Sequence, residues 1–133
     1  MPNILVIDDD DIMLKAIRNI LHKDGFNVIT AKDGKEAFEM LDTADYDIVI
    51  TDLMMPYANG LEVVSKLRND DTKRKVGIII VSSVGNDETI TEAFRLGADD
   101  YIRKPIMADD LLKHIRKLLA NKINKTQFVT KKK

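Results

Sequence analysis

Acidic residues, a serine and a lysine stand where they could together bind a metal ion and a phosphoryl group. Asp8 and Asp9 follow an apolar run in the stretch VIDDDDIM, and Asp52, Ser82 and Lys104 lie at or just beyond the ends of three further runs. Carboxylates crowded at one site repel one another unless a cation compensates them. Oxygen ligands without His or Cys suit Mg²⁺, and a nearby lysine would help to attract a phosphoryl group. The pattern predicts Mg²⁺-assisted phosphoryl chemistry.

Short apolar runs and segments of helical periodicity alternate along the chain and would position these residues. The runs lie at residues 4–7, 28–29, 48–50, 78–81 and 101–102, and none alternates apolar with polar residues. Such runs are typical of parallel strands covered on both faces. Apolar stripes with helical spacing lie at residues 12–21, 37–41, 61–67, 90–94 and 111–119. The alternation predicts right-handed βαβ crossovers and an open parallel sheet with helices on both faces.

The predicted turns and the predicted site agree with this sheet. Glycines follow or precede four of the helical segments, at Gly25, Gly34, Gly60 and Gly97, where tight or left-handed backbone is needed. Ligands of such sheets bind beyond the carboxyl ends of the strands, near the point where the strand order reverses. The acids, the serine and the lysine are therefore expected to meet at that edge.

The composition favours a single acidic domain without cysteine chemistry. The chain has 133 residues, 44% of them hydrophobic, and no Cys, which suits one compact core without disulfides or thiolate metal sites. We find no signal peptide or apolar membrane span, so we expect a cytoplasmic protein. Residues 122–133 hold five lysines and no acid, which leaves 16 basic against 22 acidic residues elsewhere. That balance is unsuited to direct nucleic-acid binding.

Four motifs in order resemble the response-regulator receiver domain of two-component signalling, of the chemotaxis-regulator-like kind: VIDDDD, VITDLMMPYANG, IIVSS and GADDYIRKPI. The resemblance covers residues 3–121, so we expect a receiver domain at residues 1–121 and a basic tail or linker stub at residues 122–133. It implies a flavodoxin-like (βα)5 fold, a three-layer αβα sandwich whose five-stranded parallel sheet has the order 2-1-3-4-5. It also implies a signalling switch rather than an enzyme, although one that supports its own phosphorylation and slow dephosphorylation.

The resemblance gives each acidic residue of the site a role. Asp52 would accept a phosphoryl group from the phosphohistidine of a histidine kinase. Asp9 and Asp52 would bind Mg²⁺ directly, Met54 would bind it through its backbone carbonyl, and Asp8 would act largely through water. Lys104 would pair with the phosphoryl group. Mg²⁺ is therefore the expected cofactor.

The same resemblance implies a switch and its partners. Ser82 would turn toward the phosphoryl oxygens, Tyr101 would follow it, and the bond before Pro105 would be cis. These contacts would favour an active state and repack the surface formed by residues 89–119. The expected partners are a sensor histidine kinase or phosphotransfer protein and a downstream protein or effector domain. We expect no direct contact with nucleic acid or membrane, and a homodimer formed on phosphorylation is compatible with the sequence.

Other residues near these motifs have plainer or less familiar roles. Asp10 and Asp11 stand at a helix start, where they would cap N–H groups and favour the helix dipole rather than bind the metal. Ser83 departs from the Ala or Gly usual in the family and could narrow access to Asp52. Met54 and Val84 are apolar at positions flanking the phosphoryl group. Neither can orient an attacking water through a polar side chain, so we predict slow self-hydrolysis.

Three other functions fit less of the sequence. A Mg²⁺-dependent phosphohydrolase of the haloacid dehalogenase type would explain the acids at residues 8–10, Ser82 and the GADD stretch. In that family, however, the lysine precedes the late acids, whereas Lys104 follows them, and Asp52 would have no role. A flavodoxin-like cofactor binder would carry a phosphate loop rich in Ser and Thr instead of four acids. A silent receiver would lack an acid or the lysine, and none is missing.

Overall fold

Strands and helices alternate strictly through the described chain. The computed structural model describes residues 2–55, 59–83 and 85–132, with side chains described as far as Asn121. The strands are β1 (Asn3–Ile7), β2 (Asn27–Ala31), β3 (Ile48–Thr51), β4 (Gly77–Ser82) and β5 (Asp100–Arg103). The helices are α1 (Asp11–Lys23), α2 (Gly34–Thr43), α3 (Gly60–Asn69), α4 (Asp87–Leu96) and α5 (Ala108–Lys132).

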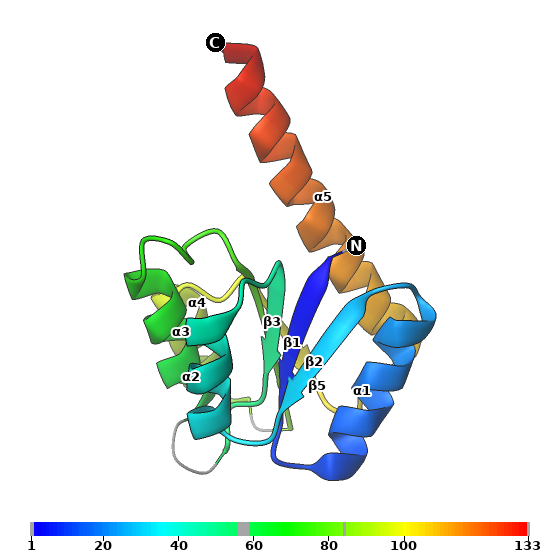
Figure 1. Ribbon diagram of the computed structural model, residues 1–133. Coiled ribbons are helices and arrows are strands. Elements are labelled where there is room, and N and C mark those ends of the chain that lie inside the picture. Colours follow the sequence, from blue (N-terminus) through cyan, green and yellow to red (C-terminus); the bar gives the residue numbers. More distant parts are fainter. Residues whose placement is uncertain (1, 56–58, 84, 133) are drawn as a thin grey trace.

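The strands form one parallel sheet in the order β2-β1-β3-β4-β5 (Figure 1). This is the strand order predicted from the sequence, and the flavodoxin-like fold is confirmed. The order reverses between β1 and β3, where Ile7 pairs with Thr51. The next residues along these two strands are Asp8 and Asp52. The topology therefore brings the first acids together at the edge where parallel sheets bind ligands.

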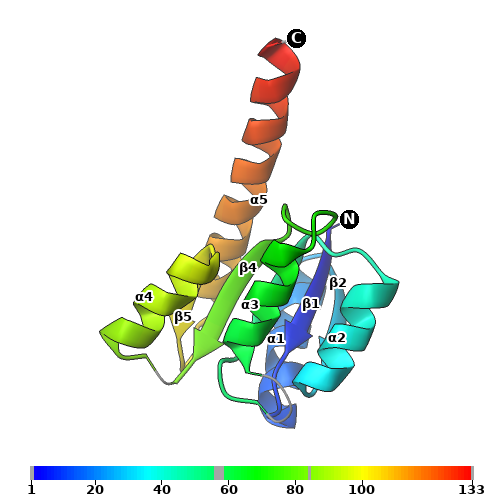
Figure 2. The same ribbon diagram turned by 90° about the vertical axis from the view of Figure 1, so that its left-hand side faces the viewer.

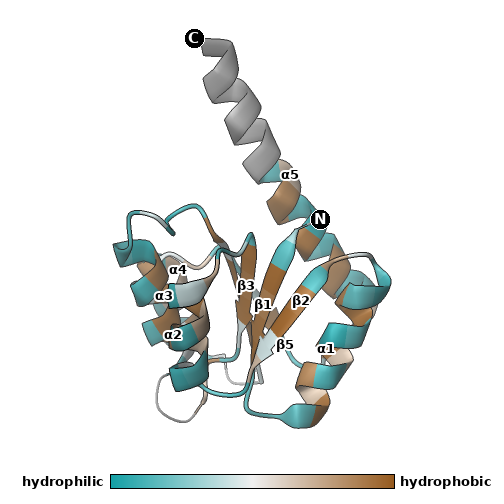
Figure 3. Cartoon of the chain, viewed as in Figure 1, coloured by the Kyte–Doolittle hydropathy of each residue, from teal (hydrophilic) through white to brown (hydrophobic). Residues whose placement is uncertain are grey.

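Helices cover both faces of the sheet, α1 and α5 on one and α2, α3 and α4 on the other (Figures 1 and 2). Alternate residues of β1 enter different cores because successive strand side chains point to opposite faces. Leu5 and Ile7 pack with α2, α3 and α4, whereas Ile4 and Val6 pack with α1 and α5. Figure 3 shows the resulting apolar strands between helices whose outer surfaces are largely hydrophilic. The sheet that carries the acids is thus held from both sides.

Polar side chains begin four of the helices. Asp10 accepts hydrogen bonds from the backbone N–H groups of Ile12 and Met13 at the start of α1, and Asp11 lies in the first turn. The predicted capping role is confirmed for Asp10, whereas Asp11 lies inside the first turn, where its charge favours the helix dipole. Equivalent caps at α2, α3 and α4 are Asp33, Asn59 and Asn86. Each satisfies an N–H group that the helix leaves without a partner.

Gly60 lets α3 begin directly against the backbone that carries Asp52. A Cβ atom at this position would lie 2.4 Å from the Asp52 carbonyl oxygen and 3.0 Å from the Leu53 Cα, closer than packed atoms approach. The Gly60 N–H also donates to the Leu53 carbonyl at 2.9 Å. A glycine is therefore needed here so that the helix and the acidic edge can approach each other.

Helix α5 is longer than the sequence periodicity predicts. It continues to Lys132, although the apolar stripe ends near residue 123, and Figure 1 shows it running past the edge opposite the acids. Residues 122–132 contain no Gly or Pro, so nothing in the backbone breaks the helix even without an apolar face. The role of this segment as a tail or linker stays a prediction. Within the described ranges, no helix has the length and apolarity needed to cross a membrane.

Arg68 ties the end of α3 to three other segments. Its Nε donates to the Gly97 carbonyl at 2.9 Å, and its Nη1 donates to the Arg74 and Val76 carbonyls at 2.8 and 2.7 Å. Its Nη2 pairs with Asp99 at 2.9 Å. Asp99 in turn accepts from the Ile78 N–H at 2.8 Å. One side chain therefore joins the end of α4 to the starts of β4 and β5.

Replacing this arginine should weaken the fold even when the positive charge is kept. Arg68→Lys cannot reproduce a planar fork, so backbone carbonyls lose their donors, and we expect the free energy of unfolding to fall by about 2 kcal/mol. Urea denaturation would measure the change. Arg95→Lys is the matched control because Arg95 is exposed and, among the described residues, forms its ion pair with Glu92 of the same helix. It should leave stability unchanged. Equal effects from the two substitutions would contradict the role given to Arg68.

Candidate functional site

Three carboxylates converge at the carboxyl ends of β1 and β3. Oxygen atoms from Asp8, Asp9 and Asp52 all lie within 4.8 Å of one another. Asp8 is 2% exposed and Asp52 is 8% exposed, whereas Asp9 is exposed. Asp8 and Asp52 each come directly after a buried strand, and these two strands are neighbours in the sheet. The sequence prediction that these acids meet at one edge thus agrees with the geometry.

Lys104 crosses the edge of the sheet to reach two of these acids. Its Nζ donates to Asp8 Oδ2 at 2.9 Å and to Asp52 Oδ2 at 3.1 Å, and its side chain is only 14% exposed. The backbone N–H of Lys104 donates to the Ser82 carbonyl at 3.0 Å, which continues the pairing of β4 and β5. The bond between Lys104 and Pro105 is cis. The lysine is thus held at the strand end with its charge directed to the acids.

The buried acids are oriented by one backbone amide each. Asp8 Oδ1 accepts from the Asp10 N–H at 3.0 Å, and Asp52 Oδ1 accepts from the Met54 N–H at 3.4 Å. The second oxygen of each carboxylate is the one that contacts Lys104. These paired contacts set the orientation of both carboxylates before any ligand arrives.

The site has more negative than positive charge. Burial raises the pKa of Asp8 above its ordinary value, and the hydrogen bonds from Asp10 and Lys104 offset only part of that rise. Burial acts to lower the pKa of Lys104, but its hydrogen bonds with Asp8 and Asp52 outweigh burial and raise it. The lysine therefore stays charged, while one cation serves two buried carboxylates. A further cation would relieve this imbalance.

The donor set fits a hard divalent cation. Asp8, Asp9 and Asp52 offer carboxylate oxygens within reach of a common point, and no histidine or cysteine belongs to this cluster of described residues. Such ligands suit Mg²⁺, which binds through few carboxylates and keeps several waters. The exposed carboxylate of Asp9 leaves the site open to water.

Ser82 and Tyr101 lie on β4 and β5, the two strands that follow β3 in the sheet. Ser82 is 1% exposed at the end of β4, and its side chain is hydrogen bonded to Tyr101. Burial raises the pKa of the Tyr101 phenol, and the hydrogen bond with Ser82 and the charge of Arg103 act in the opposite direction. The two residues expected to move together are therefore already in contact.

Some residues singled out in the sequence are not brought into the site. Ser83 is exposed, and Met54 is 63% exposed. Val84, and Pro56 of the expected loop before α3, lie outside the described residues. Sequence reasoning did not single out Arg103, which donates to the Gly85 carbonyl. Its position two residues after Tyr101 on a strand was the available signal, because such residues share a face.

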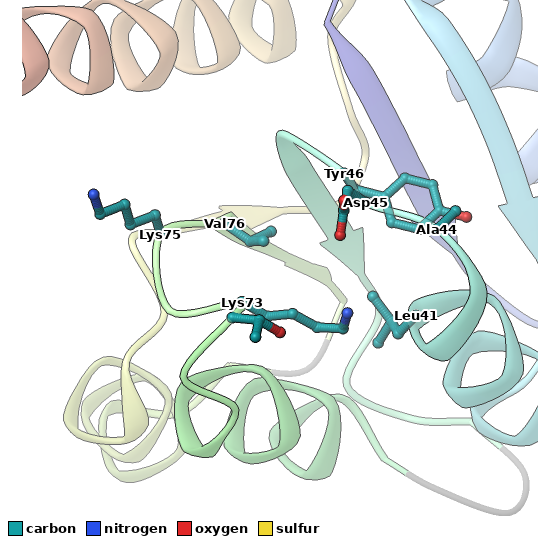
Figure 4. A pocket seen from close by; sticks show the side chains of 8 residues that line it. Leu41, Ala44, Asp45, Tyr46, Lys73, Lys75 and Val76 are labelled. Carbon is teal, nitrogen blue, oxygen red and sulfur yellow. The ribbon is translucent and has the colours of Figure 1, made fainter.

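A separate hollow of about 260 Å³ lies near the amino ends of β3 and β4 (Figure 4). Tyr46 and Val76, which precede these strands, line it together with Leu41 and Lys73. The acids stand at the carboxyl ends of the same sheet, so the hollow and the acidic site occupy opposite edges. It is not part of the candidate site.

Known proteins share both the sequence pattern and the fold. The pattern of the response regulator receiver domain matches residues 4–116. Response regulator RR06 of Streptococcus pneumoniae is 35% identical over 117 residues, which cover 88% of this chain and 52% of that protein. The transcriptional regulatory protein CpxR of Escherichia coli is 34% identical over 119 residues, 90% of this chain and 50% of CpxR. This chain spans about half the length of these curated relatives.

A solved structure agrees with these sequence matches. The CheY-like response regulator receiver domain protein from Methanospirillum hungatei has a TM-score of 0.89 and 26% identity to this chain. The match covers 94% of this chain and 98% of the solved one. The similarity therefore extends over the whole sheet and the helices that cover it.

Neutralising Asp8 should stabilise the protein without its ion while weakening metal binding. Since the folded pKa of Asp8 is raised, its stabilising contribution is present below the ordinary value of 3.8 and is lost as pH rises through the folded value. Asp8→Asn should therefore raise the free energy of unfolding at neutral pH in ion-free buffer, and the gain should vanish in acid. Its Mg²⁺ affinity should fall.

Denaturation at several pH values and Mg²⁺ titration would measure both effects. Asp10→Asn is the matched control, because Asn caps a helix as well as Asp does and Asp10 is exposed. A loss of stability in Asp8→Asn at neutral pH would show that the Lys104 pairing outweighs burial.

Proposed function

This chain belongs to the response regulator receiver domain family, and from that premise we propose that it is a signalling switch controlled by phosphorylation of Asp52. The convergence of Asp8, Asp9 and Asp52 with Lys104 at one edge is the observation that carries the proposal. Ser82 lies on the adjacent strand. The family match supports a switch rather than an enzyme of ordinary turnover, and nothing favours the hydrolase alternative.

Asp52 is the nucleophile in the proposed reaction. One of its carboxylate oxygens attacks the phosphorus of a phosphohistidine, the phosphorus–nitrogen bond breaks as the phosphorus–oxygen bond forms, and the imidazole leaves with the electron pair and takes up a proton. Mg²⁺, when bound, would supply positive charge that offsets the negative charge of the transferred group. Asp9, Asp52, the Met54 carbonyl and, through water, Asp8 would hold the ion. The amide of Met54 keeps Asp52 oriented.

Lys104 and Ser82 connect the reaction to the surface. Lys104 already contacts Asp52, so a phosphoryl group placed there meets its charge without a large movement. Ser82 would turn to the phosphoryl oxygens, which removes its present hydrogen bond to Tyr101. The resulting population shift would change the surface of residues 89–119, from α4 through β5 to α5.

The family sets the kind of partner. A sensor histidine kinase or phosphotransfer protein would supply the phosphoryl group in the cytoplasm. A downstream protein, an effector domain, or a second copy bound on phosphorylation would read the altered surface. We place the receiver domain at residues 1–121. The overall charge of that region is acidic, so the domain itself would not contact nucleic acid.

Phosphorylation with a small donor tests the proposal directly. Incubation with acetyl phosphate and Mg²⁺ should add one phosphoryl group, seen by intact mass, and Asp52→Asn or removal of Mg²⁺ should reduce the adduct at least tenfold, roughly the effect of losing an essential group. Asp45→Asn is the control, because Asp45 lies before β3 at the opposite edge. An adduct that persists in Asp52→Asn, or steady phosphate release through Asp8, would contradict the proposal.

The lifetime of the phosphoryl group should depend on Met54. Met54 follows Asp52 by two residues, and its exposed side chain is apolar. It cannot position an attacking water, so Met54→Asn should shorten the lifetime several-fold by offering a polar group. The decay of the adduct after removal of the donor would measure it. Met54→Leu, which keeps an apolar side chain of similar size, should leave the lifetime unchanged. Equal lifetimes in Met54→Asn and the unaltered protein would remove this explanation of slow hydrolysis.

A further inference from the structure

Two arginines attach the ends of α4 to the rest of the molecule, and the two attachments are unequal. Gly97, which ends α4, accepts from Arg68, whose other donors bind two more carbonyls and Asp99. Gly85 stands just before the N-cap of α4 and accepts from Arg103. Arg68 is mostly buried, with 20% of its side chain exposed, whereas Arg103 is exposed. The C-terminal end of α4 is therefore the more firmly held.

The position of Arg103 on β5 explains its reach. Because side chains alternate along a strand, Tyr101 and Arg103 share the face that packs toward α4, while Ile102 enters the core under α1 and α5. Strand β5 lies at the end of the sheet, so no further strand covers Arg103. Arg103 also pairs in register with Ser82. The arginine thus adjoins both residues of the expected switch.

Gly85 is packed directly against these side chains. A Cβ atom at Gly85 would lie 3.0 Å from the Tyr101 hydroxyl and 3.3 Å from Arg103 Nη2. The charge of Arg103 also acts to lower the pKa of Tyr101, which burial raises. The backbone before α4, the phenol and the guanidinium therefore form a single contact. A movement of Tyr101 toward Gly85 would therefore press on the backbone before α4.

This contact opposes the change that phosphorylation requires. When Ser82 turns to a phosphoryl group, Tyr101 would lose its hydrogen bond to Ser82, and the nearby backbone at Gly85 would limit the positions open to its ring. We propose that Arg103 is a positioning residue that holds the N-terminal end of α4 in the unphosphorylated arrangement, while Arg68 keeps the other end fixed. The inference rests on the proposed function and identifies a residue that would regulate the same switch.

The affinity for a phosphoryl mimic would measure how strongly Arg103 favours the unphosphorylated arrangement. The full chain, saturated with Mg²⁺, is titrated with beryllofluoride and followed by its backbone amide NMR signals. Arg103→Ala should bind the mimic roughly three- to tenfold more tightly, the population shift expected from losing one hydrogen bond that favours the other state. Its affinity for Mg²⁺ alone should not change. Arg95→Ala, which removes an exposed arginine from the same region, should behave like the unaltered protein.

Hydrogen exchange without the mimic gives a second readout. In Arg103→Ala the amides of residues 85–90 should exchange faster, while those of residues 97–99, near Arg68, should not. Unchanged or weaker binding of beryllofluoride in Arg103→Ala, or unchanged exchange at residues 85–90, would overturn the inference while leaving the switch itself intact. Failure of the unaltered protein to bind beryllofluoride through Asp52 would instead overturn the proposed function, and the inference with it.

Discussion

The contact of one lysine with two buried carboxylates is the interaction on which the rest of the site depends. Asp8 and Asp52 follow neighbouring strands, but Lys104 follows β5, two strands beyond β3 in the sheet. Its side chain therefore spans the end of β4 to reach them at 2.9 and 3.1 Å. Without this cation, two buried carboxylates would face each other in a poorly solvated place. With it, they stay close enough to bind a second, divalent cation.

The fold tolerates the repulsion between the buried carboxylates because apolar cores on both faces of the sheet fix the strands that carry them. Every residue of β3 and β4 is buried, and the two cores meet on opposite faces of the same strands. Stability thus comes from apolar burial along the strands, whereas the acids at their ends form the candidate cation site. Gly60 also serves the site rather than the core. Because it has no side chain, α3 can start directly against the backbone of Asp52.

The sheet and the position of the acids could be predicted from the sequence because both follow from the order of apolar runs and of the residues at their ends. Continuous apolar runs indicated buried parallel strands, and the strand ends placed Asp8, Asp52 and Lys104 together. Sequence reasoning could not reach the roles of Arg68 and Arg103, whose partners Gly97 and Gly85 are 29 and 18 residues away. The sequence around an arginine does not indicate which distant carbonyl group will accept its hydrogen bond. The extension of α5 was missed because apolar periodicity reports packing, not the capacity of the backbone to stay helical.

The arrangement of β4 and β5 would connect the proposed change at Asp52 to α4. Ser82 lies against the site and pairs in register with Arg103, and Arg103 contacts the residue before the α4 cap. The path from Asp52 to α4 therefore crosses two neighbouring strand pairs, β3 with β4 and β4 with β5. Since α4 is fixed through Arg68 at its far end, a displacement at its near end becomes a tilt rather than a translation. On the proposed mechanism, a small rearrangement of the Ser82 hydroxyl group would in this way alter the orientation of α4.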